Sequence, residues 1–259
     1  MRLRGGGDPL PDSWQSVAQR RLRQWPLLDD DERERLGRIA SRLLRKRWEA
    51  AHGFAIDDTM RLAVAVNAAL LSVGHDEEPF SNVTAIVIHP TTMQLRGERP
   101  GPIPGVVTNA PVPALGHTSA RGPVFIAWDT VAAELASPHG TTNVILHEFA
   151  HKMDALNGLM DGTPVLADAQ QLEEWVQVCT AELAALRRGE GGGILRPYAA
   201  TNPSEFFAVA TETFFGQPLA LRIAKPALYG VLANFYRQDP AARAVAAAAG
   251  EAVLDPTRP

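Results

Sequence analysis

Two histidines one helical turn apart constrain the fold of this 259-residue chain more than any other feature. They are His147 and His151, in the stretch VILHEFAHKMDALNG that covers residues 144–158. Apolar residues recur through this stretch at the spacing of a helix. Side chains four positions apart lie one above the other on a helix. The pattern therefore predicts a buried helix that presents both imidazoles on one face.

Local signals at both ends of the stretch support a helix. Thr141 or Thr142 can cap its start, and Asn157-Gly158 is a typical helix end. At about 100° per residue, Asp154 falls on the face of the two histidines, whereas apolar side chains gather roughly opposite. We therefore expect one apolar side and one side that carries imidazole and carboxylate groups.

Two imidazoles at this spacing can converge on one cation, at Zn–N distances of about 2.0–2.1 Å. Glu148 follows His147 directly and would lie beside such a cation. A Lewis acid next to a carboxylate that accepts the proton of water is the arrangement that hydrolysis of a peptide bond needs. The alternative is two buried histidines that only hydrogen-bond to their neighbours. We favour a metal site with Glu148 as general base and general acid.

A third ligand has to come from elsewhere, because a catalytic zinc usually takes three protein ligands. No third histidine follows at short spacing, so we expect a carboxylate from the helix predicted over residues 202–216. Glu205 and Glu212 share a face of that helix, but Glu205 can equally form a capping box with Asn202. The residue types leave this choice open. The glutamate that does not bind metal could orient a ligating imidazole, and Asp154 competes for that role.

Helix-like and strand-like segments divide the chain. Periodicity and end signals predict helices over residues 14–25, 29–48, 57–74, 166–190, 202–216 and 226–238. Strands are predicted over residues 83–90, 105–111 and 122–128. This order indicates an α+β protein with a small sheet, mixed or largely antiparallel. We expect one domain over residues 1–259, with a helical N-terminal region at 1–78 and a catalytic core at 79–259.

Charge and composition limit the class of protein. The net charge is -4, yet residues 1–50 hold 12 Lys/Arg against 8 Asp/Glu. We interpret this basic end as a solvated helix face rather than a nucleic-acid surface. The single cysteine, Cys179, allows no disulfide within the chain. No signal-peptide pattern and no run of about 18 apolar residues occur. We therefore expect a cytoplasmic protein without a membrane partner and without direct nucleic-acid contact.

Two motifs together carry a family resemblance: HEFAHKMD at residues 147–154 and YAATNPSEFFAVATETFF at residues 198–215. The chain resembles the Mlc titration factor A family of zinc-dependent peptidases, whose catalytic core is similar to the C-terminal domain of anthrax lethal factor. The resemblance covers most of the chain in order and length. It implies a zincin-like metallopeptidase domain with one zinc ion per chain.

The resemblance also implies roles for single residues. The metal ligands would be His147, His151 and Glu205, which favours Glu205 over Glu212 as the third ligand. Tyr198, seven residues before that glutamate, would donate a hydrogen bond to the oxyanion that forms when water attacks the carbonyl.

The resemblance implies, further, aminopeptidase-like activity on a peptide or protein substrate and, in some members, binding to a transcription repressor. Residues 122–128 are our candidate for a strand that pairs with extended substrate, and an interior strand without a free edge is the alternative. The competing hypothesis for the whole chain is a non-enzymatic regulator that sequesters such a repressor, with a structural zinc.

Overall fold

The N-terminal third of the chain folds into stacked helices. The computed structural model describes residues 10–76, 80–91, 94–95, 99–100, 107–108, 112–113, 120–137, 140–190 and 193–254. Helix α2 begins with a complete capping box, in which Asp29 accepts from the backbone of Glu32 and Glu32 accepts from the backbone of Asp29. The elements are α1 (Trp14–Arg21), a 3₁₀ turn (Trp25–Leu27), α2 (Asp30–Leu44) and α3 (Asp58–Leu70). Helix α3 is buried along most of its length and forms the centre of this region.

A three-stranded parallel sheet follows, in the order β1-β2-β7. Its strands are β1 (Arg47–Ala50), β2 (Val83–His89) and β7 (Gly122–Ala127). The expectation of a mixed or largely antiparallel sheet is therefore wrong for the main sheet. The physical reason is that both neighbours of β2 run in its direction. Strand β7 follows β2 after a long connection instead of a tight hairpin, and β1 is an extra strand where the sequence had predicted the end of a helix.

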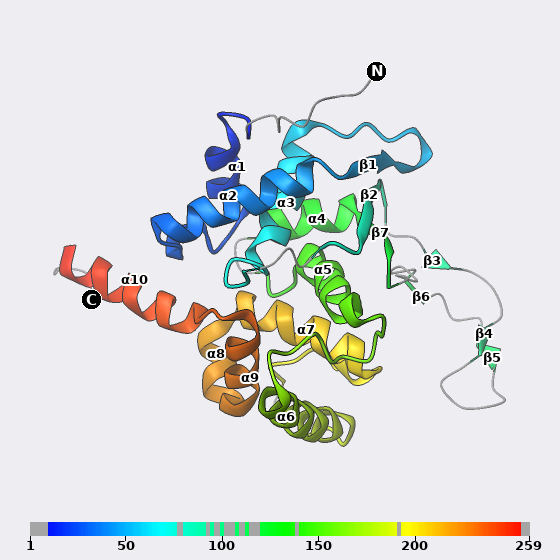
Figure 1. The fold of residues 1–259 in the computed structure, drawn as a ribbon, viewed down its shortest axis with the longest axis vertical. Coiled ribbons are helices and arrows are strands. Elements are labelled where there is room, and N and C mark those ends of the chain that lie inside the picture. The colour runs from blue at the N-terminus through cyan, green and yellow to red at the C-terminus, as the bar shows by residue number, and fades with distance from the viewer. Residues whose placement is uncertain are drawn as a thin grey trace.

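The segment between β2 and β7 contains two short antiparallel ladders. Strand β3 (Gln94–Leu95) pairs with β6 (Val112–Pro113), and β4 (Arg99–Pro100) pairs with β5 (Val107–Thr108). These ladders lie to one side of the main body (Figure 1). The strand predicted over residues 105–111 is described only at 107–108, and its other residues lie outside the described part of the chain.

Helix α5 (Val144–Asp154) passes through the middle of the molecule, and every one of its residues is buried. It packs on α3, β7 and α7 (Pro203–Gly216), as Figure 1 shows. A 3₁₀ turn (Ala155–Asn157) continues it to Gly158, whose φ of 91° is the left-handed conformation that favours glycine at a helix end. The predicted end at Asn157-Gly158 is thus confirmed.

The remaining helices cover the core on the C-terminal side. A 3₁₀ turn (Pro197–Ala200) leads into α7, and a network of aromatic rings fastens α7 to α6 and α9 through Trp175, Phe207 and Phe235. The other elements are a 3₁₀ turn (Ala51–Gly53), α4 (Trp128–Ala136), α6 (Ala169–Arg187), α8 (Pro218–Ala224), α9 (Pro226–Tyr236) and α10 (Pro240–Leu254). No helix in the described part of the chain combines the length and apolar character that a membrane-spanning helix needs.

One hydrophobic cluster joins the N-terminal helices to the rest of the molecule. It contains Leu36 of α2 and Val64 of α3 together with Phe149 of α5 and Phe214 of α7. The division into an N-terminal region and a catalytic core at residue 78 stays a prediction, and residues 77–79 lie outside the described residues. The shared cluster means that the N-terminal helices support the helix that carries the two histidines.

Candidate metal centre

Asn143, not Thr141 or Thr142, caps the start of α5. Its side chain accepts hydrogen bonds from the backbone of Ile145 and Leu146, each at 3.1 Å. The threonine prediction was wrong by one or two positions, because asparagine caps at least as well as threonine and stands directly before the first helical residue. The helix therefore begins one turn before His147.

His147 and His151 point into one small space together with Glu205 of α7. The Nε2 atoms of the two imidazoles are 3.2 Å apart. Oε2 of Glu205 lies 3.1 Å from Nε2 of His147 and 3.5 Å from Nε2 of His151. Ligand atoms about 2.0–2.1 Å from a tetrahedral zinc are about 3.3 Å from one another, which is the spacing that these three atoms have. The three residues thus fit a divalent metal ion.

The start of α7 positions Glu205 for this contact. Asn202 caps the helix by accepting from the backbone of Glu205, as predicted, and Pro203 occupies the first turn. Among the described residues only this half of a capping box forms, because the Glu205 carboxylate turns toward the imidazoles. Its Oε2 atom is buried and lacks a hydrogen-bond partner of its own. A buried acceptor of this kind is explained by a cation in the space that it faces.

The pKa shifts of His147 and Glu205 also indicate a site that favours positive charge. Burial lowers the pKa of His147, but the adjacent carboxylates of Glu205 and Glu212 outweigh this and raise it to about 10. Burial raises the pKa of Glu205, yet the two imidazoles beside it shift it well below its ordinary value. The same carboxylates would stabilise a metal cation in this space.

Glu212 orients His147 from behind. Its Oε1 atom lies 2.8 Å from Nδ1 of His147, and its Oε2 atom accepts from the backbone of Asn143 at 2.8 Å. Arg196 forms an ion pair with the same carboxylate. Glu212 is 2% exposed, so this buried charge is held by three separate donors. Of the two glutamates that the sequence offered, the structure brings Glu205 to the imidazole Nε2 atoms and Glu212 to the far side of one ring.

Asp154 reaches His151 through an intermediary that the sequence did not reveal. Ser204 donates to Oδ2 of Asp154 at 2.7 Å, and its hydroxyl lies 3.0 Å from Nδ1 of His151. Asp154 also accepts from the backbone of Gly162 at 3.0 Å. The only signal in the sequence is the position of Ser204 directly before Glu205. Each imidazole therefore has a separate partner at Nδ1, which leaves its Nε2 atom for a metal.

Glu148 lies beside the three ligand atoms and is almost completely buried, at 1% exposed. Burial raises the pKa of Glu148, and its Oε1 atom has no hydrogen-bond partner among the described residues. The ring of Tyr198, on the turn before α7, is 6.2 Å from the ring of His147. Burial also raises the pKa of Tyr198, as does the charge of Glu205, so the phenol keeps its proton. The structure thus gathers all five predicted site residues in one place.

Comparison with known proteins places this geometry in a family. The glucose-regulated metallo-peptidase M90 family matches residues 3–237. The chain belongs to this family. The family is one of metallopeptidases, and the cluster of His147, His151 and Glu205 fits a divalent metal ion.

Relatives of similar length support the assignment. An uncharacterized protein of Synechocystis is 32% identical over 90% of this chain and 86% of its own length. Mlc titration factor A of Edwardsiella ictaluri is 33% identical over 83% of this chain and 84% of its own length. Mlc titration factor A of Salmonella typhi is 32% identical over 86% of each. The resemblance to the Mlc titration factor A family is therefore confirmed.

Proposed function

We propose that this chain is a cytoplasmic, zinc-dependent peptidase with aminopeptidase-like activity, in which His147, His151 and Glu205 bind one zinc ion. The observation that carries the proposal is the convergence of three buried ligand atoms at the spacing of a tetrahedral zinc site. Membership of a metallopeptidase family is independent support for this proposal.

When bound, zinc would supply a Lewis acid that polarises the substrate carbonyl and acidifies a water molecule. Glu148 accepts the proton of that water and later delivers it to the leaving amine. Its raised pKa suits both steps, since a carboxylate with an ordinary pKa is a weaker base toward the water proton, and a pKa nearer neutral allows the same group to accept and then donate it. Tyr198 keeps its phenolic proton and donates it as a hydrogen bond to the carbonyl oxygen while negative charge develops there.

The position of strand β7 supports the proposal that the substrate is a peptide. Among the described strands it pairs with β2 alone, so it forms an edge of the three-stranded sheet. Helix α5 packs against this strand. We propose that extended substrate adds to the free side of β7 through backbone hydrogen bonds and thereby reaches the metal centre.

Replacement of the general base tests the proposal. Glu148→Gln is expected to keep one zinc per chain, because the three ligands are intact, and to lose hydrolysis of aminoacyl and peptide fluorogenic substrates by at least 100-fold. Glu34→Gln is the matched control, since this exposed glutamate on α2 pairs with Arg38 on the surface, away from the site. A Glu148→Gln protein with unchanged turnover would refute the proposed mechanism.

A regulatory role is the second candidate, and the name of the relatives, Mlc titration factor A, favours it. In this version the chain binds a transcription repressor, and the basic N-terminal helices supply the contact surface. A repressor capture assay separates the two candidates. Binding that survives Glu148→Gln but is lost after charge reversal of exposed α1 and α2 arginines would support the regulator. The two functions are compatible in one molecule.

A further inference from the structure

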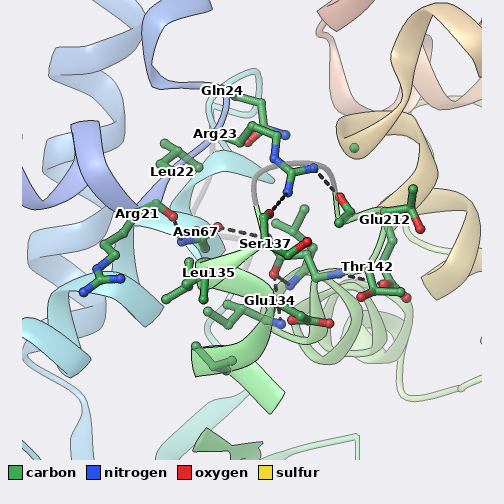
Figure 2. Close-up of a pocket in the computed structure, with 18 of the residues that line it drawn as sticks. Arg21, Leu22, Arg23, Gln24, Asn67, Glu134, Leu135, Ser137, Thr142 and Glu212 are labelled. Atoms are coloured by element: carbon green, nitrogen blue, oxygen red, sulfur yellow. Dashed lines mark hydrogen bonds between the residues drawn. The ribbon is translucent and has the colours of Figure 1, made fainter. Parts of the chain in front are cut away.

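A buried asparagine of the N-terminal helices lies close to the metal centre. Asn67, on α3, is 1% exposed and forms part of the wall of a cavity behind that centre. Glu212, which orients His147, lies in the wall of the same cavity (Figure 2). A side-chain amide that is buried this deeply costs stability unless its donors and its acceptor are paired.

The amide of Asn67 is paired at both ends, and its orientation is fixed. Its Nδ2 atom donates to the backbone carbonyls of Arg21, at 3.0 Å, and of Ala63, at 2.9 Å. Because carbonyls can only accept, the NH₂ end must face them and Oδ1 must face the other way. Oδ1 accepts from Nδ2 of Asn143, at 2.9 Å. Asn67 therefore joins the end of α1 to the cap of α5.

Asn143 carries this connection to Glu212. Its Oδ1 atom accepts from the backbone N–H groups of Ile145 and Leu146, so its NH₂ end is the one that faces Asn67. Its own backbone N–H donates to Oε2 of Glu212, at 2.8 Å. The position of the cap thus decides where Glu212 finds this donor.

Glu212 completes the connection at a proposed metal ligand. Its Oε1 atom lies 2.8 Å from Nδ1 of His147. Hydrogen bonds therefore run without interruption from the carbonyl of Arg21 to the imidazole of His147. The members of such a buried polar network hold one another in place.

The residues after α1 are fastened to the same part of the molecule by separate contacts. Nε2 of Gln24, which is buried, donates to the carbonyl of Phe215 near the end of α7, at 2.6 Å. Arg23 donates to the carbonyl of Ser137, at 3.1 Å, and to that of Gly140. The N-terminal region is thus attached both to the segment before α5 and to the end of α7 (Figure 2).

We propose that Asn67 is a positioning residue of the metal centre. Through the cap Asn143 it holds the Glu212 carboxylate against Nδ1 of His147, and the N-terminal helices thereby raise the zinc affinity of the site. Asn67 touches none of the reacting groups and acts only through Glu212. This inference rests on the proposed zinc site.

Asn67→Leu tests the proposal, because it removes the amide and roughly keeps the volume of the side chain. We expect zinc affinity, measured by competition with a chromophoric chelator, to fall by about 3–10-fold, less than for a direct partner of a ligating histidine. Asn143→Ser should have the same effect, since serine caps a helix as well as asparagine does but has no amide to donate to Asn67. The double variant should lose no more affinity than either single variant.

A cycle with Glu212 separates positioning from a purely structural role. Glu212→Ala removes the carboxylate through which Asn67 acts, so Asn67→Leu should change zinc affinity no further in this background. The loss in free energy of unfolding of the metal-free protein, measured with urea, should persist in both backgrounds. Gln238→Met is the matched control, since this buried glutamine also donates to a carbonyl of α3, that of Leu70, but is not part of the network. It should lose stability and keep its zinc affinity.

Zinc affinity unchanged in both Asn67→Leu and Asn143→Ser would overturn the proposal. An equal loss from Asn67→Leu with and without the Glu212 carboxylate would overturn it as well. If Asn67→Leu does not fold, Asn143→Ser and its combination with Glu212→Ala decide in the same way. Failure of the proposed zinc site would look different, since the wild-type chain itself would bind no zinc, and the positioning role would fall with it.

Discussion

Nδ1 of His147 lies 2.8 Å from Oε1 of Glu212, and this contact decides which nitrogen of His147 is available to a metal. A carboxylate can only accept, so Nδ1 carries the hydrogen. The lone pair of Nε2 then faces His151 and Glu205. The hydroxyl of Ser204 orients the ring of His151 in a similar way. Both imidazoles thus present Nε2 to the same space.

Glu212→Gln is expected to weaken zinc binding by about 10–100-fold, the usual cost of losing a partner that orients a metal-bound histidine. The amide keeps the shape of the side chain but loses the negative charge that His147 and Arg196 share. Competition with a chromophoric chelator measures the affinity. Glu34→Gln, the same change on the surface of α2, provides the control. Equal zinc affinity in Glu212→Gln and wild type would show that Glu212 has only a structural role.

Ser204→Ala should separate His151 from Asp154. We expect zinc affinity to fall by about tenfold and the free energy of unfolding by about 1–3 kcal/mol, because Asp154 stays buried with one donor fewer. Chelator competition and urea unfolding measure the two effects. Ser41→Ala on α2 removes a hydroxyl that accepts from Arg45 and should change neither quantity. If both variants behave alike, the contacts of Ser204 with Asp154 and His151 do not contribute to zinc affinity or stability.

The pH dependence of stability should carry a signature of His75. Burial lowers its pKa from 6.5 to about 4, and the charge of Arg237 acts in the same direction, whereas Asp76 opposes it. Between these two pKa values the unfolded chain binds more protons than the folded one, so stability falls as the pH falls. The slope from this group is at most about 1.4 kcal/mol per pH unit.

Urea unfolding of wild type and His75→Gln at pH 7 and pH 5 measures this contribution. The difference in free energy of unfolding between the two pH values should be smaller in the variant. The rings of Phe235 and Tyr236 lie against His75, so some loss of stability at both pH values is expected as well. The same pH response in both proteins would mean that His75 is not responsible.

Most of the helices, and the residues that gather in the candidate metal centre, were predictable from the sequence because their signals are local, whereas α4 and α8 were missed. Spacing alone places His147 and His151 on one face of a helix, and the cap at Asn202 fixes the start of α7 before Glu205. The choice between Glu205 and Glu212 needed the family resemblance. Spacing puts both on one face, while their distances to the imidazoles depend on how α5 packs against α7.

The parallel sheet was not predictable because strand pairing is not local. Strand β1 is exposed at three of its four positions, so its residues lack the alternation that indicates a half-buried strand. Its arginine and glutamate looked like the continuation of α2. Only the ladder with β2 defines it as a strand. Ser204 and Arg196 were missed for a similar reason, since their partners are far away in the chain.

Zinc content and hydrolysis measured on the same samples test the central claim most directly. Wild type and Glu205→Ala are compared by metal mass spectrometry and with aminoacyl and peptide fluorogenic substrates, and Glu34→Gln serves as control. The account predicts one zinc per chain in wild type and control, with loss of both zinc and hydrolysis in Glu205→Ala. A folded wild-type protein that binds no zinc and hydrolyses nothing after zinc is added would contradict it.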